Sequence, residues 1–196
     1  MRVEFARPPI YGKQVENLRR ILEANARYAE SAHSSSLAAM PAQNLVVITC
    51  MDCRLNPYEA FGLAAGEAHV LRNAGGIVTG DTLRSLIVSH GLLGTKEAVV
   101  IMHTDCGMAK YSEREVRAKL GLGRARRPFR FGCFTSVEEA LAESLAKIRR
   151  CSLLPPNFKV HGLIFDVTDG RLKPLDGEAQ ARPRTRLQRL VSAVRR

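Results

Sequence analysis

The chain has 196 residues, of which 45% are hydrophobic and 25% are charged, a composition typical of a globular domain. No apolar run approaches the ~18 residues that a membrane-spanning helix needs, and residues 1–9 lack the apolar core of a secretory signal. Five cysteines form an odd set without framework spacing, which argues against a secreted disulfide scaffold. We therefore expect a cytoplasmic protein whose thiols are free to bind metal.

The formal net charge of +11 is concentrated in two segments, residues 110–130 and 178–196. The first segment has eight basic residues against two acidic ones, and the second has six against one. Neither contains the interleaved aromatic residues or the recognisable motif of a nucleic-acid-binding protein. We interpret both as solvated surface or subunit contact, with a field that also attracts small inorganic anions, and we do not expect nucleic acid as a partner.

Apolar strands alternate with amphipathic helices along the chain. Helix starts are marked by Asn56 before Pro57 and by a capping box from Ser136 to Glu139. The predicted elements are a helix over 12–31, a strand over 44–49, a helix from 56, a strand over 67–72, a helix from 79 that ends near Gly91 or Gly94, a strand over 97–102, a helix from 136, a strand over 160–167 and a short strand over 172–175. This order predicts an α/β fold with a mainly parallel central sheet, helices on both faces and a short antiparallel strand near the C-terminus.

We expect a single domain in three segments: an N-terminal helical arm over 1–43, a catalytic core over 44–176 and a basic tail over 177–196. Residues 185–196 can form a helix with one apolar side. So short a helix is marginal alone in water, so we expect it to rest on the body of the chain or on a neighbouring subunit. An anionic membrane surface or nucleic acid is the alternative.

Two short motifs each follow an apolar run that reads as a buried strand. Cys50-Met51-Asp52-Cys53-Arg54 follows residues 45–49, and His103-Thr104-Asp105-Cys106-Gly107 follows residues 98–102. Ligands of parallel sheets bind beyond the carboxyl ends of the strands. Two thiols and one imidazole there, from Cys50, His103 and Cys106, predict a zinc site. Three protein ligands leave a fourth position for water, as catalytic rather than structural zinc sites do.

Asp52 and Arg54 would lie beside this site as a charged pair. A solvated ion pair would contribute almost nothing. If Arg54 instead holds Asp52 by a bidentate contact, Asp52 can accept a hydrogen bond from zinc-bound water, or ligate the zinc itself if it is released. Asp105 could orient a ligand from outside the site or cap the helix that follows.

The pattern Cys-x-Asp-x-Arg followed by His-x-x-Cys-Gly resembles the β-class carbonic anhydrases over residues 44–166, and Arg72-Asn73-Ala74-Gly75-Gly76 is similar to the turn between the two motifs in that family. The resemblance implies a β-carbonic-anhydrase-like fold, zinc ligands Cys50, His103 and Cys106, and a catalytic dyad of Asp52 and Arg54. The form His-Thr-Asp-Cys-Gly-Met is similar to a short-chain branch that also includes hydrolases of carbonyl sulfide and carbon disulfide.

The activity that the resemblance implies is attack of zinc-bound hydroxide on a small linear substrate, foremost the reversible hydration of carbon dioxide to bicarbonate. Hydrolysis of carbonyl sulfide or carbon disulfide, which releases hydrogen sulfide, is the alternative. The resemblance also implies a homodimer or homotetramer in which the helix over 12–31 reaches a partner. Allosteric members carry Trp and Gly where this chain has Val47 and Thr49, so we expect an open site in which Arg54 holds Asp52.

One departure from the family pattern is Cys53, which stands where Ser or Ala is common. It creates a Cys50-x-x-Cys53 spacing, for which a thioredoxin-like redox motif is the rival interpretation. That interpretation leaves His103 and Cys106 without a role. Cys53 could otherwise be a small buried side chain, or a redox-sensitive neighbour that takes Cys50 from zinc. A third class of function, a non-enzymatic zinc or thiol module that binds a partner, leaves the charged pair unexplained.

Overall fold

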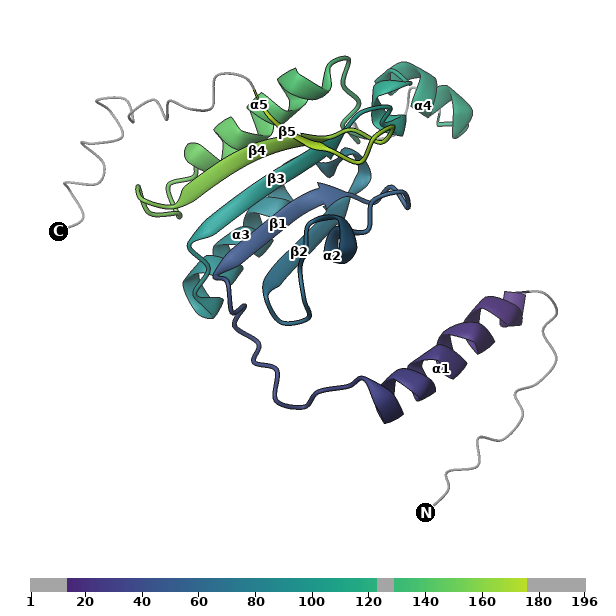
Figure 1. The fold of residues 1–196 in the computed structure, drawn as a ribbon. Helices are drawn as coiled ribbons and strands as arrows, with labels where there is room; N and C mark the ends of the chain where they lie inside the picture. Colours follow the sequence, from purple (N-terminus) through teal and green to yellow (C-terminus); the bar gives the residue numbers. More distant parts are fainter. Residues whose placement is uncertain (1–13, 123–128, 176–196) are drawn as a thin grey trace. The chain divides into compact units, whose positions relative to one another are not determined.

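The computed structural model describes residues 14–122 and 129–175 (Figure 1). The chain divides into two compact units, one ending at Leu37 and one beginning at Ala38. None of the helices in the described ranges is both long enough and apolar enough to cross a membrane. The tail helix predicted over 185–196 lies outside the described residues.

The first unit contains helix α1, Gln14–Ser31, where the sequence predicted a helix. Two ion pairs stabilise its polar side: Arg19 lies 2.7 Å from Glu16 and 2.7 Å from Glu23. Its apolar side is exposed, with 55% of Leu18 and 65% of Ile21 accessible to solvent. An amphipathic helix gains most of its stability from packing its apolar face.

The second unit is built on one five-stranded sheet (Figure 1). Its strands are β1 Leu45–Cys50, β2 Ala68–Asn73, β3 Glu97–His103, β4 Lys159–Phe165 and β5 Leu172–Pro174. They lie in the order β2-β1-β3-β4-β5. All neighbouring pairs are parallel except β4 and β5, which are antiparallel. The predicted α/β class with a short antiparallel strand is confirmed.

Helices cover the two faces of the sheet unequally. The larger core joins one face to helices α3, Gly80–Leu93, and α5, Val137–Arg149, through side chains such as Leu86 and Leu145. The smaller core lies on the opposite face, where Leu55 and Phe61 flank the short helix α2, Pro57–Ala60, and pack against Val47 and Ile101. Figure 1 shows α2 as the one short helix in front of the sheet, with α3 behind it.

The helix caps differ in part from the prediction. Of the two predicted ends of helix α3, Gly94 is confirmed: the helix ends at Leu93, and Gly94 caps it in the left-handed conformation. Ser136 caps α5 by accepting the N–H of Glu139, and its hydroxyl donates to Glu138. A complete capping box instead begins helix α4, Glu113–Lys119, which the sequence analysis did not predict.

The strands that lead to the two motifs each extend one residue beyond the prediction. Cys50 pairs with Asn73 and is the last residue of β1, and His103 pairs with Phe165 and is the last residue of β3. Because β1 and β3 are adjacent and parallel, their carboxyl ends meet at one edge of the sheet. This register brings residues 53 positions apart in the chain together.

Candidate metal centre

The three predicted ligands lie together at the carboxyl edge of the sheet. Cys50 ends β1, His103 ends β3, and Cys106 precedes the short 3-10 helix η2, Gly107–Ala109. Their potential ligand atoms all lie within 4.8 Å of one another, and all three side chains are buried. The arrangement is a compact set of two sulfur donors and one nitrogen donor.

The hydrogen bonding of His103 leaves one ring nitrogen available as a metal ligand. Its Nδ1 lies 2.8 Å from the carbonyl oxygen of Thr104. A carbonyl oxygen only accepts hydrogen bonds, so Nδ1 carries the proton and Nε2 presents a lone pair. That buried Nε2 has no hydrogen-bond partner among the described residues, an arrangement that is costly unless another group binds it. Imidazole and thiolate ligands suit zinc, and a carbonyl acceptor on the far nitrogen is typical of metal-bound histidine. The residues therefore fit zinc.

The two thiols are electrostatically linked. A hydrogen bond from Cys106 lowers the pKa of the Cys50 thiol. The same contact, together with burial, raises the pKa of the Cys106 thiol. One thiolate is thus already favoured without metal, while the second forms only with loss of a proton when a cation binds.

A glycine turn and an arginine fix the end of β1. Arg72 donates from Nε to the carbonyl oxygen of Cys50 at 2.9 Å and from Nη2 to that of Asp52 at 2.7 Å. The 3-10 turn η1, Ala74–Gly76, passes against the same strand end, where a Cβ on Gly76 would lie 2.8 Å from the backbone nitrogen of Cys50. The backbone that carries Cys50 is therefore held from two sides.

Asp52 and Arg54 form the bidentate pair that the sequence suggested. Nε of Arg54 donates to Oδ1 of Asp52 at 3.0 Å, and Nη2 donates to Oδ2 at 2.8 Å. These hydrogen bonds hold the pKa of the Asp52 carboxyl well below its usual range. Oδ2 of Asp52 also lies 3.8 Å from Nε2 of His103. An ionised acceptor therefore stands directly beside the cluster.

Two sets of contacts around the site were not predicted from the sequence. Asp105 neither caps η2 nor touches a ligand side chain through its carboxylate, but lies against Arg54 and Lys110. Thr104 accepts the N–H of Val167 at 3.0 Å and lies 3.5 Å from Asp166. The second link ties the His103 loop to the end of β4.

The remaining cysteines lie outside the cluster. Cys53 is exposed while Cys50 is buried, and the two are not joined by a disulfide. The interpretation of Cys53 as a small buried side chain is therefore wrong, because the turn after β1 directs this residue to solvent. Cys133 and Cys151 are half-buried free thiols.

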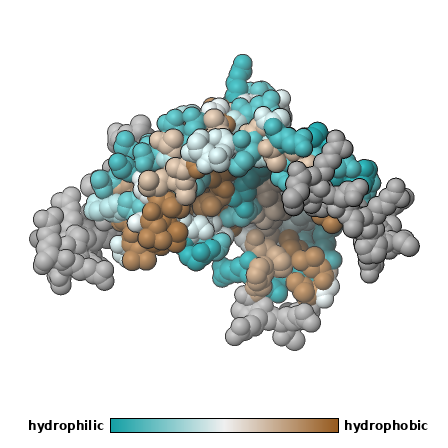
Figure 2. Space-filling model, turned by 90° about the horizontal axis from the view of Figure 1, so that it is seen from below, coloured by the Kyte–Doolittle hydropathy of each residue, from teal (hydrophilic) through white to brown (hydrophobic). Residues whose placement is uncertain are grey.

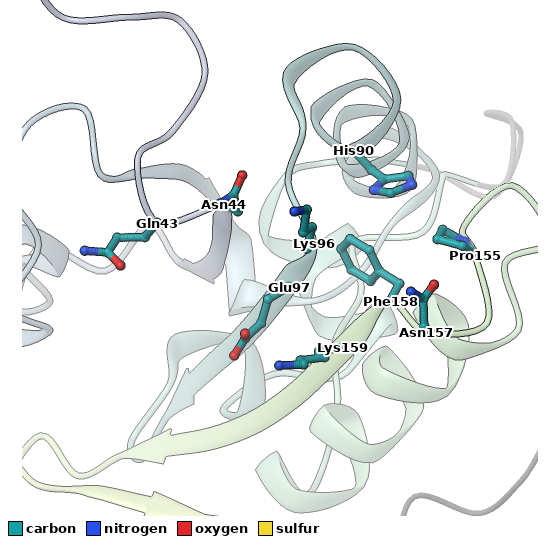
Figure 3. A pocket seen from close by; sticks show the side chains of 9 residues that line it. All are labelled: Gln43, Asn44, His90, Lys96, Glu97, Pro155, Asn157, Phe158 and Lys159. Atoms are coloured by element: carbon teal, nitrogen blue, oxygen red, sulfur yellow. The ribbon is translucent and has the colours of Figure 1, made fainter.

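A separate cavity of about 310 Å³ lies at the amino ends of the strands (Figure 3). Glu97 and Lys159, the first residues of β3 and β4, line it together with Phe158 and His90. Figure 3 shows His90 on a helix and Glu97 and Lys159 on neighbouring strands around this cavity, and the first residues of β3 and β4 lie at the end of the sheet opposite the cluster. Because ligands of parallel sheets bind at the carboxyl ends of the strands, the cluster is the better candidate for the reaction centre.

Comparisons with known proteins identify the family of the chain. The family model described as carbonic anhydrase matches residues 45–126. β-Carbonic anhydrase 1 of Mycobacterium tuberculosis is 35% identical over 155 residues, which cover 77% of this chain and 93% of the relative. A carbon disulfide hydrolase of Acidithiobacillus thiooxidans is 32% identical over 183 residues, covering 80% and 81%.

A solved structure gives the same result for the fold. The crystal structure of carbonic anhydrase from Streptococcus mutans matches with a TM-score of 0.76 and 37% identity, and the match covers 81% of this chain and 97% of that one. Sequence, sheet order and structural likeness therefore lead to one family. The chain belongs to the β-carbonic anhydrases, a family that includes carbon disulfide hydrolases.

Proposed function

We propose that Cys50, His103 and Cys106 bind one zinc ion per chain and that the protein catalyses the reversible hydration of carbon dioxide. The observation that carries the proposal is the buried three-donor cluster with an Arg-held aspartate beside it. A structural zinc site would need a fourth protein ligand, whereas a catalytic site keeps one position for water. The hydrogen bonds of Arg54 to the Asp52 carboxylate favour a catalytic site, because they hold this carboxylate as a partner of the arginine rather than as a fourth ligand.

When bound, zinc supplies a Lewis acid that lowers the pKa of a coordinated water from about 15.7 toward 7. The protein's own groups do the rest. Asp52 is kept ionised by Arg54 and can accept a hydrogen bond that orients the attacking water toward the substrate carbon. Water adds to carbon dioxide to give bicarbonate and one proton. The buried position of His103 and both thiols limits competing contacts with bulk solvent.

Hydrolysis of a sulfur analogue is the second candidate. It is favoured by the A. thiooxidans relative, which is named a carbon disulfide hydrolase and shares 32% identity. Carbonyl sulfide and one water would give carbon dioxide and hydrogen sulfide, and carbon disulfide and two waters would give carbon dioxide and two hydrogen sulfides. Both are linear molecules like carbon dioxide, so the same residues serve either reaction.

The deciding experiment is a parallel turnover assay of the purified, zinc-loaded protein on carbon dioxide, carbonyl sulfide and carbon disulfide. We expect the highest kcat/KM on carbon dioxide, read from proton release by stopped flow. Hydrogen sulfide release at a higher kcat/KM would assign the second function. Zinc-loaded protein without turnover on any of the three would support a binding module instead.

We further propose a homodimer or homotetramer that works in the cytoplasm. On the less covered face of the sheet, Val70, Val99 and Leu163 are half-buried and pack around the smaller core. Figure 2 shows hydrophobic residues at the surface in the view from below. Within such an assembly, residues 1–43 would be the arm that reaches a partner, 44–176 the catalytic core and 177–196 a basic tail.

A further inference from the structure

Asp105 lies between two cations, one on each carboxylate oxygen. Nη1 of Arg54 donates to Oδ2 of Asp105 at 2.9 Å, and Nζ of Lys110 lies 2.7 Å from Oδ1. Nη2 of Arg54 also donates to the backbone carbonyl of Asp105 at 3.1 Å. The same guanidinium is therefore bound by two acceptors of one residue.

The backbone of Asp105 makes this double contact possible. Its φ is +54°, in the left-handed region that only Asn44 shares among the described residues other than glycine. Aspartate tolerates this region better than most residues, yet it still costs energy, and such strain gathers at functional sites. At Asp105 both the carbonyl and the carboxylate reach Arg54, so the strained conformation coincides with a contact to the charged pair.

Arg54 is thereby held along both of its edges. Nε and Nη2 bind Asp52, while Nη1 has Asp105 as its acceptor within the described part of the chain. The Arg54 side chain is 43% exposed. An exposed ion pair with one carboxylate alone would be weak, because a long side chain is free to leave it. Two carboxylates on a planar fork restrict it to one position.

The position of Arg54 matters because the Asp52 carboxylate lies close to the proposed metal ligands. Its Oδ2 lies 3.8 Å from Nε2 of His103, a proposed ligand. A carboxylate released from Arg54 could therefore reach a metal ion held by the cluster and fill the position that water needs. The contacts that hold Arg54 in place therefore decide whether Asp52 binds the Arg54 guanidinium or the metal ion.

We propose that Asp105 is a positioning residue that holds Arg54 on Asp52, and that Lys110 supports it by fixing the orientation of the Asp105 carboxylate. This inference rests on the proposed metal centre. In this proposal Asp105 prevents Asp52 from binding the metal ion, and the fourth coordination position of the metal stays available to small ligands.

The test uses the full chain loaded with Co²⁺, whose visible spectrum reports its ligands, and azide as the probe of the open position. In Asp105→Asn, which still tolerates a left-handed backbone, we expect azide affinity to fall about tenfold or more, the effect of losing one charge-assisted hydrogen bond. Lys110→Gln should weaken azide binding in the same direction but less, because its ion pair is exposed. Lys110→Arg should restore the wild-type value.

A double variant separates positioning from general damage. Asp52→Asn removes the carboxylate that would occupy the metal, so Asp105→Asn combined with Asp52→Asn should recover azide affinity to within about threefold of Asp52→Asn alone. A distorted site would not recover. Asp81→Asn is the matched control, since Asp81 pairs with exposed Arg84 on α3 and should leave azide binding unchanged.

The outcomes distinguish this inference from the proposed function. Wild-type protein that binds Co²⁺ and azide, with the same azide affinity in Asp105→Asn and Lys110→Gln, overturns the positioning role alone. Wild-type protein without a thiolate-to-cobalt absorption band overturns the metal centre and the inference together. Absence of turnover on carbon dioxide, with the azide pattern as expected, leaves the positioning role supported and overturns only the proposed reaction.

Discussion

The α-carbon of Gly76 packs against the backbone of Cys50. A Cβ at this position would lie 2.8 Å from the nitrogen of Cys50 and 3.0 Å from the carbonyl carbon of Thr49. The φ of Gly76 is +66°, a region that favours glycine. Both sterics and backbone conformation therefore require glycine beside Cys50, the first residue of the proposed metal site.

Gly76→Ala should destabilise the protein by about 1–3 kcal/mol, the cost of a strained backbone together with displacement of the strand end. The measurement is urea denaturation, followed by zinc analysis of the folded protein. Gly91→Ala is the control: this site in α3 has open space around it, and alanine there should gain up to about 1 kcal/mol. Equal stability of Gly76→Ala and wild type would show that the turn can move away from β1.

Cys106→Ser should lose most of its zinc and all of its activity, because a hydroxyl is a poor replacement for a thiolate ligand. Zinc per chain, measured by elemental analysis after desalting, checks this against one ion in the wild type. Cys53→Ser is the matched control, since Cys53 is exposed and outside the cluster. It should keep both zinc and activity, and loss of zinc from it would revive a Cys-x-x-Cys site.

Asp52→Asn should retain zinc but lose about 100-fold or more in turnover, the lower range for a positioned group that handles protons. Asparagine has the same shape, so a change in activity at constant zinc content isolates the charge. Asp169→Asn, at an exposed aspartate before β5, should leave turnover unchanged. Near-normal turnover in Asp52→Asn would contradict a catalytic role for the pair.

Much of the fold could be predicted because it depends on local patterns. The apolar runs before Cys50 and His103 predicted β1 and β3, and the alternation with helices predicted a parallel sheet. Helix α4 was missed because its polar sequence has little apolar periodicity, although Ser112 and Glu115 provide a capping-box signal.

The sequence predicted that the candidate ligands lie close together, but it did not predict the contacts that support them. Two strand ends in adjacent parallel strands suffice to bring Cys50 and His103 together. The contact of Arg54 with Asp105 depends on a left-handed backbone at Asp105, which no pattern in the sequence indicates. The link from Thr104 to Val167 joins segments 63 positions apart and follows only from the pairing of β3 with β4.

The contribution of Asp166 to stability should depend on pH. Hydrogen bonds from Thr168 and Lys173 lower the pKa of Asp166 to about 2. Since this value lies below that of the unfolded chain, about 3.9, the carboxylate stabilises the folded state at higher pH, and the contribution is lost as the pH falls toward 2. Wild type should therefore be more stable than Asp166→Asn at pH 7, with a gap that narrows between about pH 4 and 2.

Urea denaturation of both proteins, freed of metal by a chelator, measures this gap without a contribution from zinc loss in acid. Lys173→Met should reduce the gap in part, because Lys173 lies 3.2 Å from Asp166. A difference in unfolding free energy that stays constant across this pH range would show that Asp166 has an ordinary pKa.

Light scattering at micromolar concentration should give the mass of two or four chains. Ile21→Asp, on the exposed apolar side of α1, should shift the protein toward the monomer, because a buried unpaired charge is costly in an interface. Glu30→Gln, on the same helix, should leave the mass unchanged. A wild-type monomer at this concentration would contradict the proposed assembly.

The short length of the edge strand β5 has a consequence for aggregation. A long open strand edge is a template for aggregation, and short strands, prolines and charges protect against it. β5 has only three residues and ends at Pro174, which has no N–H to offer, and the part of β4 beyond it carries the exposed side chains of Lys159 and His161. The sheet therefore resists growth by strand addition at its β5 edge.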